Sequence, residues 1–356
     1  MTKPKAAIFT FCNNNGPVNY GQVLQCFAVG KLLEENGYDH CTVLYQKNKI
    51  SELMTERVRR FREFVSEYIP TSRPCYTIED VEDVVKDYDL LVCGSDQVWF
   101  PYTIDRVWTL GVGKEKSKRI SIAASGLFYD DEITNEKVSL YKTYLEQMDY
   151  ISVRERSAVS ILKECINKDI DIIPDPTLFF GKIIWDELIC EKGKSEEYIL
   201  CYCLSDIRPY DLIFKRLSDI YGNIKIKYIV SNLTENHCYA GMEPVYDAGP
   251  KEFIGLIREA SAVVTDSFHG VIFSVIYGKD WYNLDRMTEG IDRFGGRTRV
   301  NNLLSLIPGD CGWIRNVKDV DRRAEILKTI DYSGIKDNVK AARDRINNII
   351  SDYDEP

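Results

Sequence analysis

The sequence predicts an α/β protein of two doubly wound, Rossmann-like lobes that face each other across a cleft. Short apolar stretches alternate with longer helix-like stretches in both halves of the chain, which is typical of parallel strands joined by crossover helices. A charged segment, residues 181–196, separates the halves and predicts a linker. The chain has 356 residues and 44% hydrophobic content, enough for two separate cores.

The first lobe is expected to extend over 1–185 and to begin with a buried strand at 6–11. A helix is predicted at 22–35, because its apolar residues recur on one face. The pair Asn36-Gly37 then ends that helix in the usual way. Further buried strands are predicted at 41–45, 88–93, 119–124 and 150–153.

The second lobe repeats this alternation and is expected to extend over 196–330. The remaining segment, 331–356, contains a helix-like stretch at 336–353 that is expected to pack back on the first lobe. Ligands of doubly wound sheets bind at the C-terminal ends of the strands, so candidate site residues are expected there. Strands are predicted at 198–204, 225–230 and 262–265, and helices at 209–221, 251–260 and 268–277.

A helical insertion is predicted at 51–70. Its apolar residues are spaced four, three, four and three apart, which places them in one helical stripe. They are Met54, Val58, Phe61, Val65 and Tyr68, and four arginines lie mostly off the stripe. The stripe either packs on its own lobe or forms a lip that contacts an anionic membrane surface or a lipid-linked substrate.

The composition disfavours several classes of partner and site. A net charge of −9 argues against nucleic acid, because phosphate binding needs a basic surface. Eleven cysteines without a C-x-x-C pair favour reduced thiols over a disulfide framework or a metal site. The apolar stretch at the N-terminus is too short for a signal peptide, and none approaches the roughly 20 residues of a membrane span. We therefore expect a cytoplasmic protein, peripheral at the inner face of the membrane if the insertion is a lip.

The strongest candidate site is the turn TDSFHG at 265–270. Its first three residues are types that cap helices, and an apolar helix-like stretch follows. A helix start at the end of a parallel strand offers free backbone N–H groups to a phosphate. Ser267 adds a hydroxyl, Gly270 allows close backbone approach, and His269 can bind an anion or donate a proton. The alternative is a helix cap with an incidental histidine.

A second candidate follows the strand 150–153, which ends in Arg-Glu-Arg. Arginine is the preferred bidentate partner of carboxylate and phosphate. Arg154 would face the cleft at this strand end, with Glu155 to orient it. A solvated charged turn is the alternative.

A third candidate is the glycine turn GSDQVW at 94–99. Such a turn suits a sugar, because Asp96 and Gln97 can bond hydroxyls and Trp99 can stack on the ring. A purely structural turn is the alternative.

Two further loops carry polar groups. The loop 13–25 lacks G-x-G-x-x-G, which argues against a dinucleotide site, but its residues 19–22, Asn-Tyr-Gly-Gln, suit a sugar or an anion. The loop 292–300 carries three arginines around two glycines and would suit gripping an anion, although a plain surface loop explains it equally well. These arginines are Arg293, Arg297 and Arg299.

Taken in order, these motifs resemble the polysaccharide pyruvyl transferase family. The similarity extends over roughly residues 6–305, and its best marker is SFHG after two β-branched residues, with SVRE upstream. The chain departs from the family in having GQVLQ where many members have a G-D pair, and GSDQ where they have a run of glycines. The matching stretches are NYGQVLQ (19–25), GSDQVW (94–99), ISIAASG (120–126), ISVRERS (151–157), DPTLFF (175–180) and VVTDSFHG (263–270).

The resemblance implies a fold similar to two-lobed, GT-B type glycosyltransferases. It also implies transfer of the enolpyruvyl unit of phosphoenolpyruvate to two hydroxyls of one sugar, with release of phosphate. The product is a pyruvate ketal on a polysaccharide or its precursor, as in exopolysaccharide or capsule biosynthesis. The first lobe would hold the saccharide acceptor, which is lipid-linked if the insertion serves as a lip. The second lobe would hold phosphoenolpyruvate. No cofactor and no metal are implied.

The resemblance would make His269 the proton donor or phosphate partner, and Arg154 the clamp on phosphoenolpyruvate. A carboxylate must deprotonate the sugar, and we prefer Asp96 to Asp266 for this. The donor would be bound by Arg154, Ser267, His269, Gly270 and one of Arg293, Arg297 or Arg299. The acceptor would be bound by Asn19, Tyr20, Gln22, Ser95, Asp96, Gln97 and Trp99.

Three other functions remain open from the sequence. A glycosyltransferase that uses a nucleotide-sugar would have nearly the same fold. A non-catalytic sugar-binding protein would bind the acceptor without releasing phosphate. A transferase that stops at an enolpyruvyl ether would give an isomer of the ketal.

Overall fold

The computed structural model divides the chain into two compact units. Unit 1 comprises Met1–Met54, Phe61–Phe180 and Asp337–Pro356, and unit 2 comprises Thr55–Arg60 and Gly181–Lys336. The structure describes residues 3–12, 18–46, 54–100, 104–126, 135–189, 196–231, 241–285, 296–305 and 312–352.

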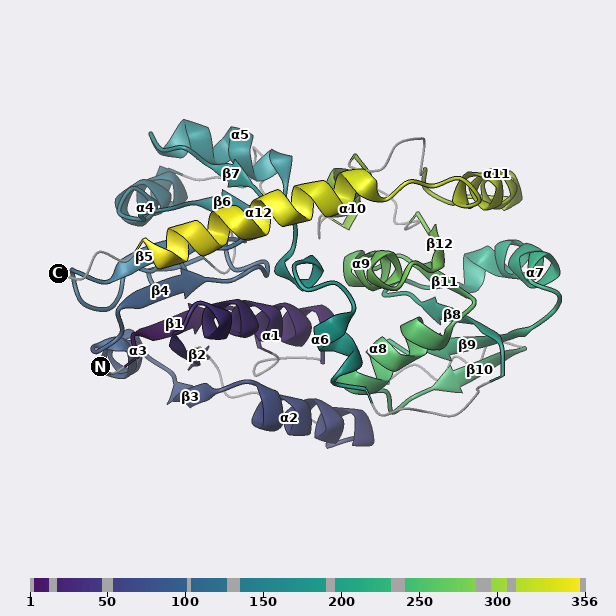
Figure 1. Cartoon of the computed structure of the whole chain (residues 1–356), viewed down its shortest axis with the longest axis horizontal. Coiled ribbons are helices and arrows are strands. Elements are labelled where there is room, and N and C mark those ends of the chain that lie inside the picture. The colour runs from purple at the N-terminus through teal and green to yellow at the C-terminus, as the bar shows by residue number, and fades with distance from the viewer. Residues whose placement is uncertain are drawn as a thin grey trace. The chain divides into compact units, whose positions relative to one another are not determined.

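Unit 1 is built on a parallel five-stranded sheet in the order β3-β2-β1-β4-β5 (Figure 1). Short strands β6 and β7 pair with each other, and single bridges join the β6 region to the end of the sheet at β5. Buried apolar runs such as LLVC in β4 reflect a sheet covered on both faces. The strands are β1 (Lys5–Phe9), β2 (Asp39–Tyr45), β3 (Thr71–Cys75), β4 (Leu90–Cys93), β5 (Lys118–Ser121), β6 (Ser152–Val153) and β7 (Asp171–Ile172).

The helices of unit 1 follow the strands in the expected alternation. Helix α1 is buried along most of its length and begins at Asn19, whose side chain accepts a hydrogen bond from the Gln22 amide. The helices are α1 (Tyr20–Glu35), α3 (Ile78–Val85), α4 (Asn135–Leu145), α5 (Arg156–Cys165) and most of α2 (Glu56–Tyr68) and α12 (Ser333–Ser351). A short 3-10 turn, η2, covers Pro176–Leu178.

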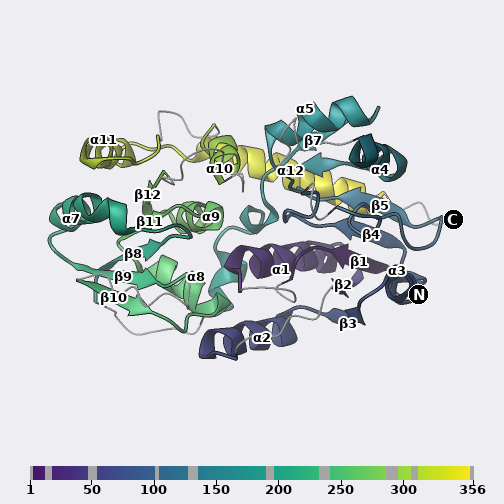
Figure 2. The ribbon, with the colours of Figure 1, turned by 180° about the vertical axis from the view of Figure 1, so that it is seen from behind.

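Unit 2 repeats the same topology with a parallel sheet in the order β10-β9-β8-β11-β12 (Figure 2). The predicted strand 262–265 and helix 268–277 have the bounds of β11 and α9. The strands are β8 (Tyr198–Tyr202), β9 (Lys225–Ile229), β10 (Met242–Val245), β11 (Ala262–Thr265) and β12 (Asp280–Asn283). The helices are α6 (Ile183–Asp186), α7 (Asp211–Ile220), α8 (Pro250–Glu259), α9 (Phe268–Tyr277), α10 (Gly296–Leu304) and α11 (Val317–Leu327).

The α/β class with parallel sheets is thereby confirmed, and each sheet reverses its winding at a definite place. In unit 1 the chain winds from β1 to β2 and β3 and then returns to the other side of β1 with β4. In unit 2 the same reversal separates β8 from β11. Ligands of doubly wound sheets bind at the C-terminal ends of the two strands that flank this switch point. The residues that follow β1, β4, β8 and β11 are therefore expected to form the ligand sites.

The insertion at 51–70 forms α2, but its apolar stripe is covered by protein. Phe61 packs on Tyr20, and Tyr68 packs on Phe27 of α1, with ring centroids 5.0 and 6.2 Å apart. Residues 47–53 lie outside the described part of the chain. The lip interpretation is corrected for the residues described, because only Met54 of the stripe is strongly exposed.

The C-terminal helix α12 packs along unit 1 (Figure 1). Arg343 donates to the carbonyl of Phe179, and Asn36 donates to Asn347. Lys118 donates to the carbonyl of Ile349 near the end of the helix. The boundary between the units falls after Phe180, so residues 181–185 belong to unit 2 instead of the first lobe.

Gly94 allows the end of β4 to pass close to Thr10 at the switch point of unit 1. A Cβ added at Gly94 would lie 2.8 Å from Cβ of Thr10. We predict that Gly94→Ala lowers the free energy of unfolding by about 1–3 kcal/mol, as overpacking does, measured by urea denaturation. The control is Gly255→Ala in α8, where the added Cβ meets only Ile189 at 3.3 Å. Equal stability of the two variants would contradict the prediction.

Candidate functional site

The switch point of unit 1 is organised by Gln25 of α1. Its amide nitrogen donates to Oγ1 of Thr10 at 2.9 Å and to the carbonyl of Phe11 at 3.2 Å. Its amide oxygen accepts from the backbone N–H of Ser95 at 3.1 Å. One buried side chain therefore joins the ends of β1 and β4, which explains why a glutamine stands inside an otherwise apolar helix.

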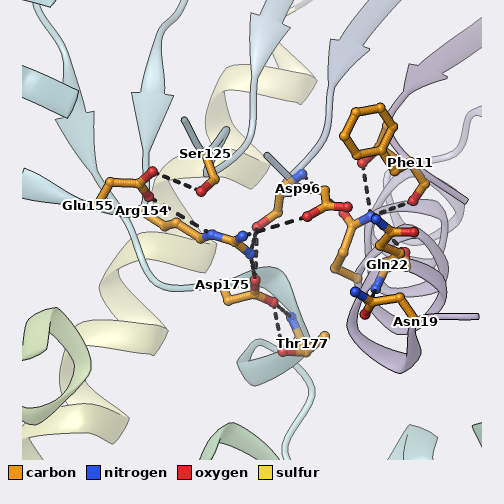
Figure 3. Close-up of polar contacts among 12 residues, drawn as sticks. Phe11, Asn19, Gln22, Asp96, Ser125, Arg154, Glu155, Asp175 and Thr177 are labelled. Atoms are coloured by element: carbon orange, nitrogen blue, oxygen red, sulfur yellow. Dashed lines mark hydrogen bonds and ion pairs between the residues drawn. The ribbon is translucent and has the colours of Figure 1, made fainter. Parts of the chain in front are cut away.

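Arg154 lies in a buried ionic cluster directly after β6 (Figure 3). Its Nη1 is 2.6 Å from Oδ2 of Asp175, which also accepts a hydrogen bond from Oγ of Ser95 at 3.0 Å. The other oxygen of Asp175 accepts from the N–H and the hydroxyl of Thr177. The ion pair thus ties together the GSDQ, SVRE and DPT segments, which are distant in the sequence.

Glu155 holds the segment that follows β5. Its Oε1 accepts from Oγ of Ser125 and from the N–H of Gly126, both at 2.8 Å. Reciprocal hydrogen bonds between Ser121 and Ser152 join the two stretches upstream of these residues. The ISIAASG and ISVRERS motifs are therefore held together by hydrogen bonds between them.

Asp96 is the carboxylate of this cluster with the fewest partners. Its Oδ1 is 3.9 Å from Nη2 of Arg154, beyond hydrogen-bond distance, and its Oδ2 has no hydrogen-bond partner among the described residues. Three carboxylates, from Asp96, Glu155 and Asp175, surround the single guanidinium of Arg154. Among the described residues of this cluster, Asp96 thus has a buried carboxylate oxygen that can still accept a hydrogen bond.

Several residues predicted to bind the acceptor are structural. Trp99 is fully buried and its Nε1 donates to the carbonyl of Trp108, so it cannot stack on a sugar. Tyr20 is buried against Phe61, and Ser95 is buried against Asp175. Asn19 caps α1, whereas Gln22 and Gln97 are partly exposed. Asp96, Gln22 and Gln97 remain as candidate acceptor contacts.

The switch point of unit 2 is the start of α9, with Ser267 as N-cap. The Ser267 side chain makes no capping hydrogen bond to the helix, so the first-turn N–H groups lack that partner. A Cβ at Gly270 would lie 2.3 Å from Oγ1 of Thr265. The glycine therefore lets the helix pack on the strand end, which corrects the expectation that its free space serves a ligand.

Asp266 joins the ends of β8 and β11. Its carboxylate accepts from the N–H of Leu204 at 2.7 Å, and from the N–H and hydroxyl of Ser205 at 2.9 and 2.5 Å. It is 1% exposed. Because its oxygens accept hydrogen bonds from three donors, Asp266 joins the two strand ends and is disfavoured as a base.

His269 is in the first turn of α9 and is 8% exposed. Its ring packs edge-on against Phe268, and the guanidinium of Arg299 from α10 lies 5.5 Å from the Phe268 ring centroid. A cation and a histidine therefore both lie against one aromatic ring at the helix start. Arg293 and the side chain of Arg297 lie outside the described part of the chain.

Three residues of these clusters had no role predicted from the sequence. Asp175 and Gln25 lie within motifs that were noted, DPTLFF and NYGQVLQ, but no role was assigned to them. Asn283 ends β12, in register with Thr265 and so on the face covered by α9. It is 1% exposed, and its amide finds no hydrogen-bond partner among the described residues. A buried amide without a partner is costly, so Asn283 lowers the stability of this strand end.

A buried cysteine follows the central strand of each sheet, Cys12 after β1 and Cys203 after β8. The pKa of the Cys12 thiol is raised well above its usual value by a hydrogen bond with Cys26 and by burial. Burial, with the neighbouring Cys201, likewise raises the pKa of Cys203. Both groups stay thiols near neutral pH, which disfavours a cysteine nucleophile. The described residues contain no group of three or more potential metal ligands, and none of their helices is long and apolar enough to cross a membrane.

The model of the polysaccharide pyruvyl transferase family matches residues 19–286. No curated protein matches the chain.

Solved structures of two-lobed, GT-B type enzymes share the fold. UDP-GlcNAc 2-epimerase from Methanocaldococcus jannaschii is 13% identical, with a TM-score of 0.57 over 98% of this chain and 99% of that one. The enzyme from Neisseria meningitidis, solved with UDP-GlcNAc, is 11% identical, with a TM-score of 0.57 over 97% and 98%. At such identities the likeness concerns the fold alone.

The buried pair of Arg154 and Asp175 is expected to dominate the stability of unit 1. Asp175→Ala leaves a buried guanidinium without its nearest counter-charge and should cost about 3–5 kcal/mol of unfolding free energy. The control is Asp321→Ala, which removes the partly exposed pair with Arg216 and should cost about 1 kcal/mol or less. Chemical denaturation of both variants measures this, and a similar loss in the two would refute it.

Proposed function

The chain belongs to the polysaccharide pyruvyl transferase family, and we propose that it moves the enolpyruvyl unit of phosphoenolpyruvate onto two hydroxyls of one sugar. The acceptor is a polysaccharide or its precursor, and the product is a pyruvate ketal with release of phosphate. The observation that carries this proposal is the start of α9, where His269 and Arg299 both lie against Phe268 and the N-cap side chain leaves first-turn N–H groups uncapped.

The donor chemistry is assigned to unit 2. Phosphoenolpyruvate carries about three negative charges, so an acidic protein needs local cations and N–H donors to hold it. The α9 start supplies backbone donors and the positive end of the helix dipole. Arg299 supplies a guanidinium for phosphate or carboxylate.

The bonds change in three steps. His269 gives a proton to the methylene carbon, which makes the neighbouring carbon electrophilic. A sugar hydroxyl attacks that carbon, and phosphate leaves with the electrons of its C–O bond. The second hydroxyl then adds to the same carbon and gives its proton to the phosphate that has left, which closes the ketal ring. If the methyl group loses a proton to that phosphate instead, the product is the isomeric enolpyruvyl ether, so NMR of the product, and not its mass, identifies the outcome.

The acceptor chemistry is assigned to unit 1. Asp96 takes the proton of the attacking hydroxyl, because its Oδ2 has no other hydrogen-bond partner among the described residues. The sequence suggested Arg154 as the clamp on phosphoenolpyruvate, but its side chain is 1% exposed and paired with Asp175. We therefore assign Arg154 to positioning Asp96. The sugar itself and any lipid carrier remain to be identified by an acceptor screen.

Replacing His269 tests the proposed proton donor. His269→Ala should lower turnover by about 10²-fold or more, the scale of general acid catalysis. The matched control is His40→Ala, since His40 lies in unit 1 beside Glu34 and has no proposed role in the reaction. Turnover is measured as phosphate released from phosphoenolpyruvate by folded protein. Near-normal turnover in His269→Ala would remove this residue from the mechanism.

Thermal denaturation with candidate donors tests the class of substrate. Phosphoenolpyruvate should raise the melting temperature of the wild type by mass action. The shift should be smaller in Arg299→Gln and retained in Arg216→Gln, whose arginine lies on α7 and pairs with Asp321. A shift with UDP and none with phosphoenolpyruvate would instead favour a nucleotide-sugar glycosyltransferase. Sugar binding without phosphate release would favour a non-catalytic protein.

A further inference from the structure

Asp175 fixes the position of the Arg154 guanidinium in the buried cluster of unit 1 (Figure 3). Nη1 of Arg154 lies 2.6 Å from Oδ2 of Asp175. Nη2 lies 3.9 Å from Oδ1 of Asp96, and Nε lies 4.0 Å from Oε2 of Glu155. Of these three distances, only the first is short enough for a hydrogen bond. The guanidinium, which lies among three carboxylates, is therefore held at Asp175.

The Asp175 carboxylate is itself immobilised by its surroundings. Its Oδ1 accepts from the N–H of Thr177 at 3.1 Å and from the hydroxyl of Thr177 at 2.7 Å. Its Oδ2 accepts from the hydroxyl of Ser95 at 3.0 Å and from Arg154. The side chain is fully buried and caps the 3-10 turn η2. Because Asp175 is held on both oxygens, its fixed charge determines where the guanidinium lies.

Asp96 is held differently, although it is also buried. Its Oδ2 has no hydrogen-bond partner within the described ranges of the chain. A carboxylate that accepts two charge-assisted hydrogen bonds from a guanidinium is stabilised in its ionised form and is a weak proton acceptor. At 3.9 Å, Arg154 keeps its charge near Asp96 without forming such a bidentate pair.

We propose that Asp175 is a positioning residue, which holds the Arg154 guanidinium away from Asp96 and so keeps Asp96 able to act as the base. This inference rests on the proposed function, in which Asp96 takes the proton of the attacking hydroxyl as its oxygen bonds to the donor carbon. Without the charge of Asp175, the guanidinium would turn to Asp96 and pair with it. Asp175 thus acts on the reaction through Arg154 and needs no contact with either substrate.

Crystal structures of the wild type and of Asp175→Asn test the positioning without an acceptor. Asparagine has nearly the volume of aspartate and can still accept from Thr177, but it carries no charge. In the variant, a terminal nitrogen of Arg154 should lie within about 3.2 Å of the Asp96 carboxylate, a hydrogen bond that the wild type lacks. A guanidinium that stays at residue 175, or turns to Glu155, would overturn the inference.

Turnover tests the consequence for the base. Phosphate release from phosphoenolpyruvate is measured with a panel of methyl hexopyranosides as acceptors. Asp175→Asn should lower kcat by about 10-fold or more, because general base catalysis is weakened, and should leave the KM for phosphoenolpyruvate nearly unchanged. The matched control is Asp321→Asn, which removes the same charge from the partly exposed pair with Arg216 and should keep the wild-type kcat. A wild-type kcat in Asp175→Asn would contradict the inference.

Removing both partners separates positioning from a purely structural role. The double variant Arg154→Gln, Asp175→Asn removes the buried pair as a unit, which costs less than removing one partner, so it is expected to fold even if Asp175→Asn does not. Its kcat should lie within about 10-fold of the wild type, because no guanidinium is left to pair with Asp96. A kcat as low as that of Asp96→Asn would refute the positioning role. No phosphate release by the wild type would instead refute the proposed function, and the crystal structures would still decide where Asp175 holds the guanidinium.

Discussion

The ion pair between Arg154 and Asp175 is the interaction on which the candidate site of unit 1 depends. At 2.6 Å and fully buried, it joins segments that follow different strands. Ser95 shares the same carboxylate oxygen, which fixes the turn after β4. Removing one partner of a buried ion pair lowers stability much more than replacing both partners by apolar residues, because the remaining charge stays buried without its partner. The SVRE and DPT motifs are therefore coupled by electrostatics, and neither is informative alone.

In unit 2 the strand ends at the switch point are also joined by a buried polar side chain, but of a different residue type. Both sheets have five parallel strands with a reversal beside the first strand, so each must hold two loop ends together there. In unit 1 the amide of Gln25 joins these ends, and in unit 2 the carboxylate of Asp266 does so. Because the Asp266 carboxylate already accepts three hydrogen bonds, it is poorly suited to serve as a base. Among the described residues that follow β1, β4, β8 and β11, Asp96 has a carboxylate oxygen without a hydrogen-bond partner.

The polar groups at the two switch points differ in charge, so the two units suit different kinds of ligand. The switch point of unit 1 is rich in carboxylate and suits hydroxyl groups. The switch point of unit 2 combines a helix start, His269 and the nearby Arg299, and suits an anion. This contrast supports the proposed anionic donor and sugar acceptor, and the chain belongs to the polysaccharide pyruvyl transferase family.

The sequence by itself determined the class of fold and the turn that carries His269. Apolar strands alternating with amphipathic helices encode a parallel sheet locally, and β11 and α9 could be bounded because the strand runs directly into cap residues. The short edge strands β3, β10 and β12 escaped prediction, since their sequences lack a long apolar run. Only the tertiary structure decided which polar residues face inward. Trp99 and Arg154 look like ligand contacts in the sequence, yet one is bonded to the Trp108 carbonyl and the other to Asp175. A side chain's burial depends on partners up to tens of residues away, and local pattern carries no information about them.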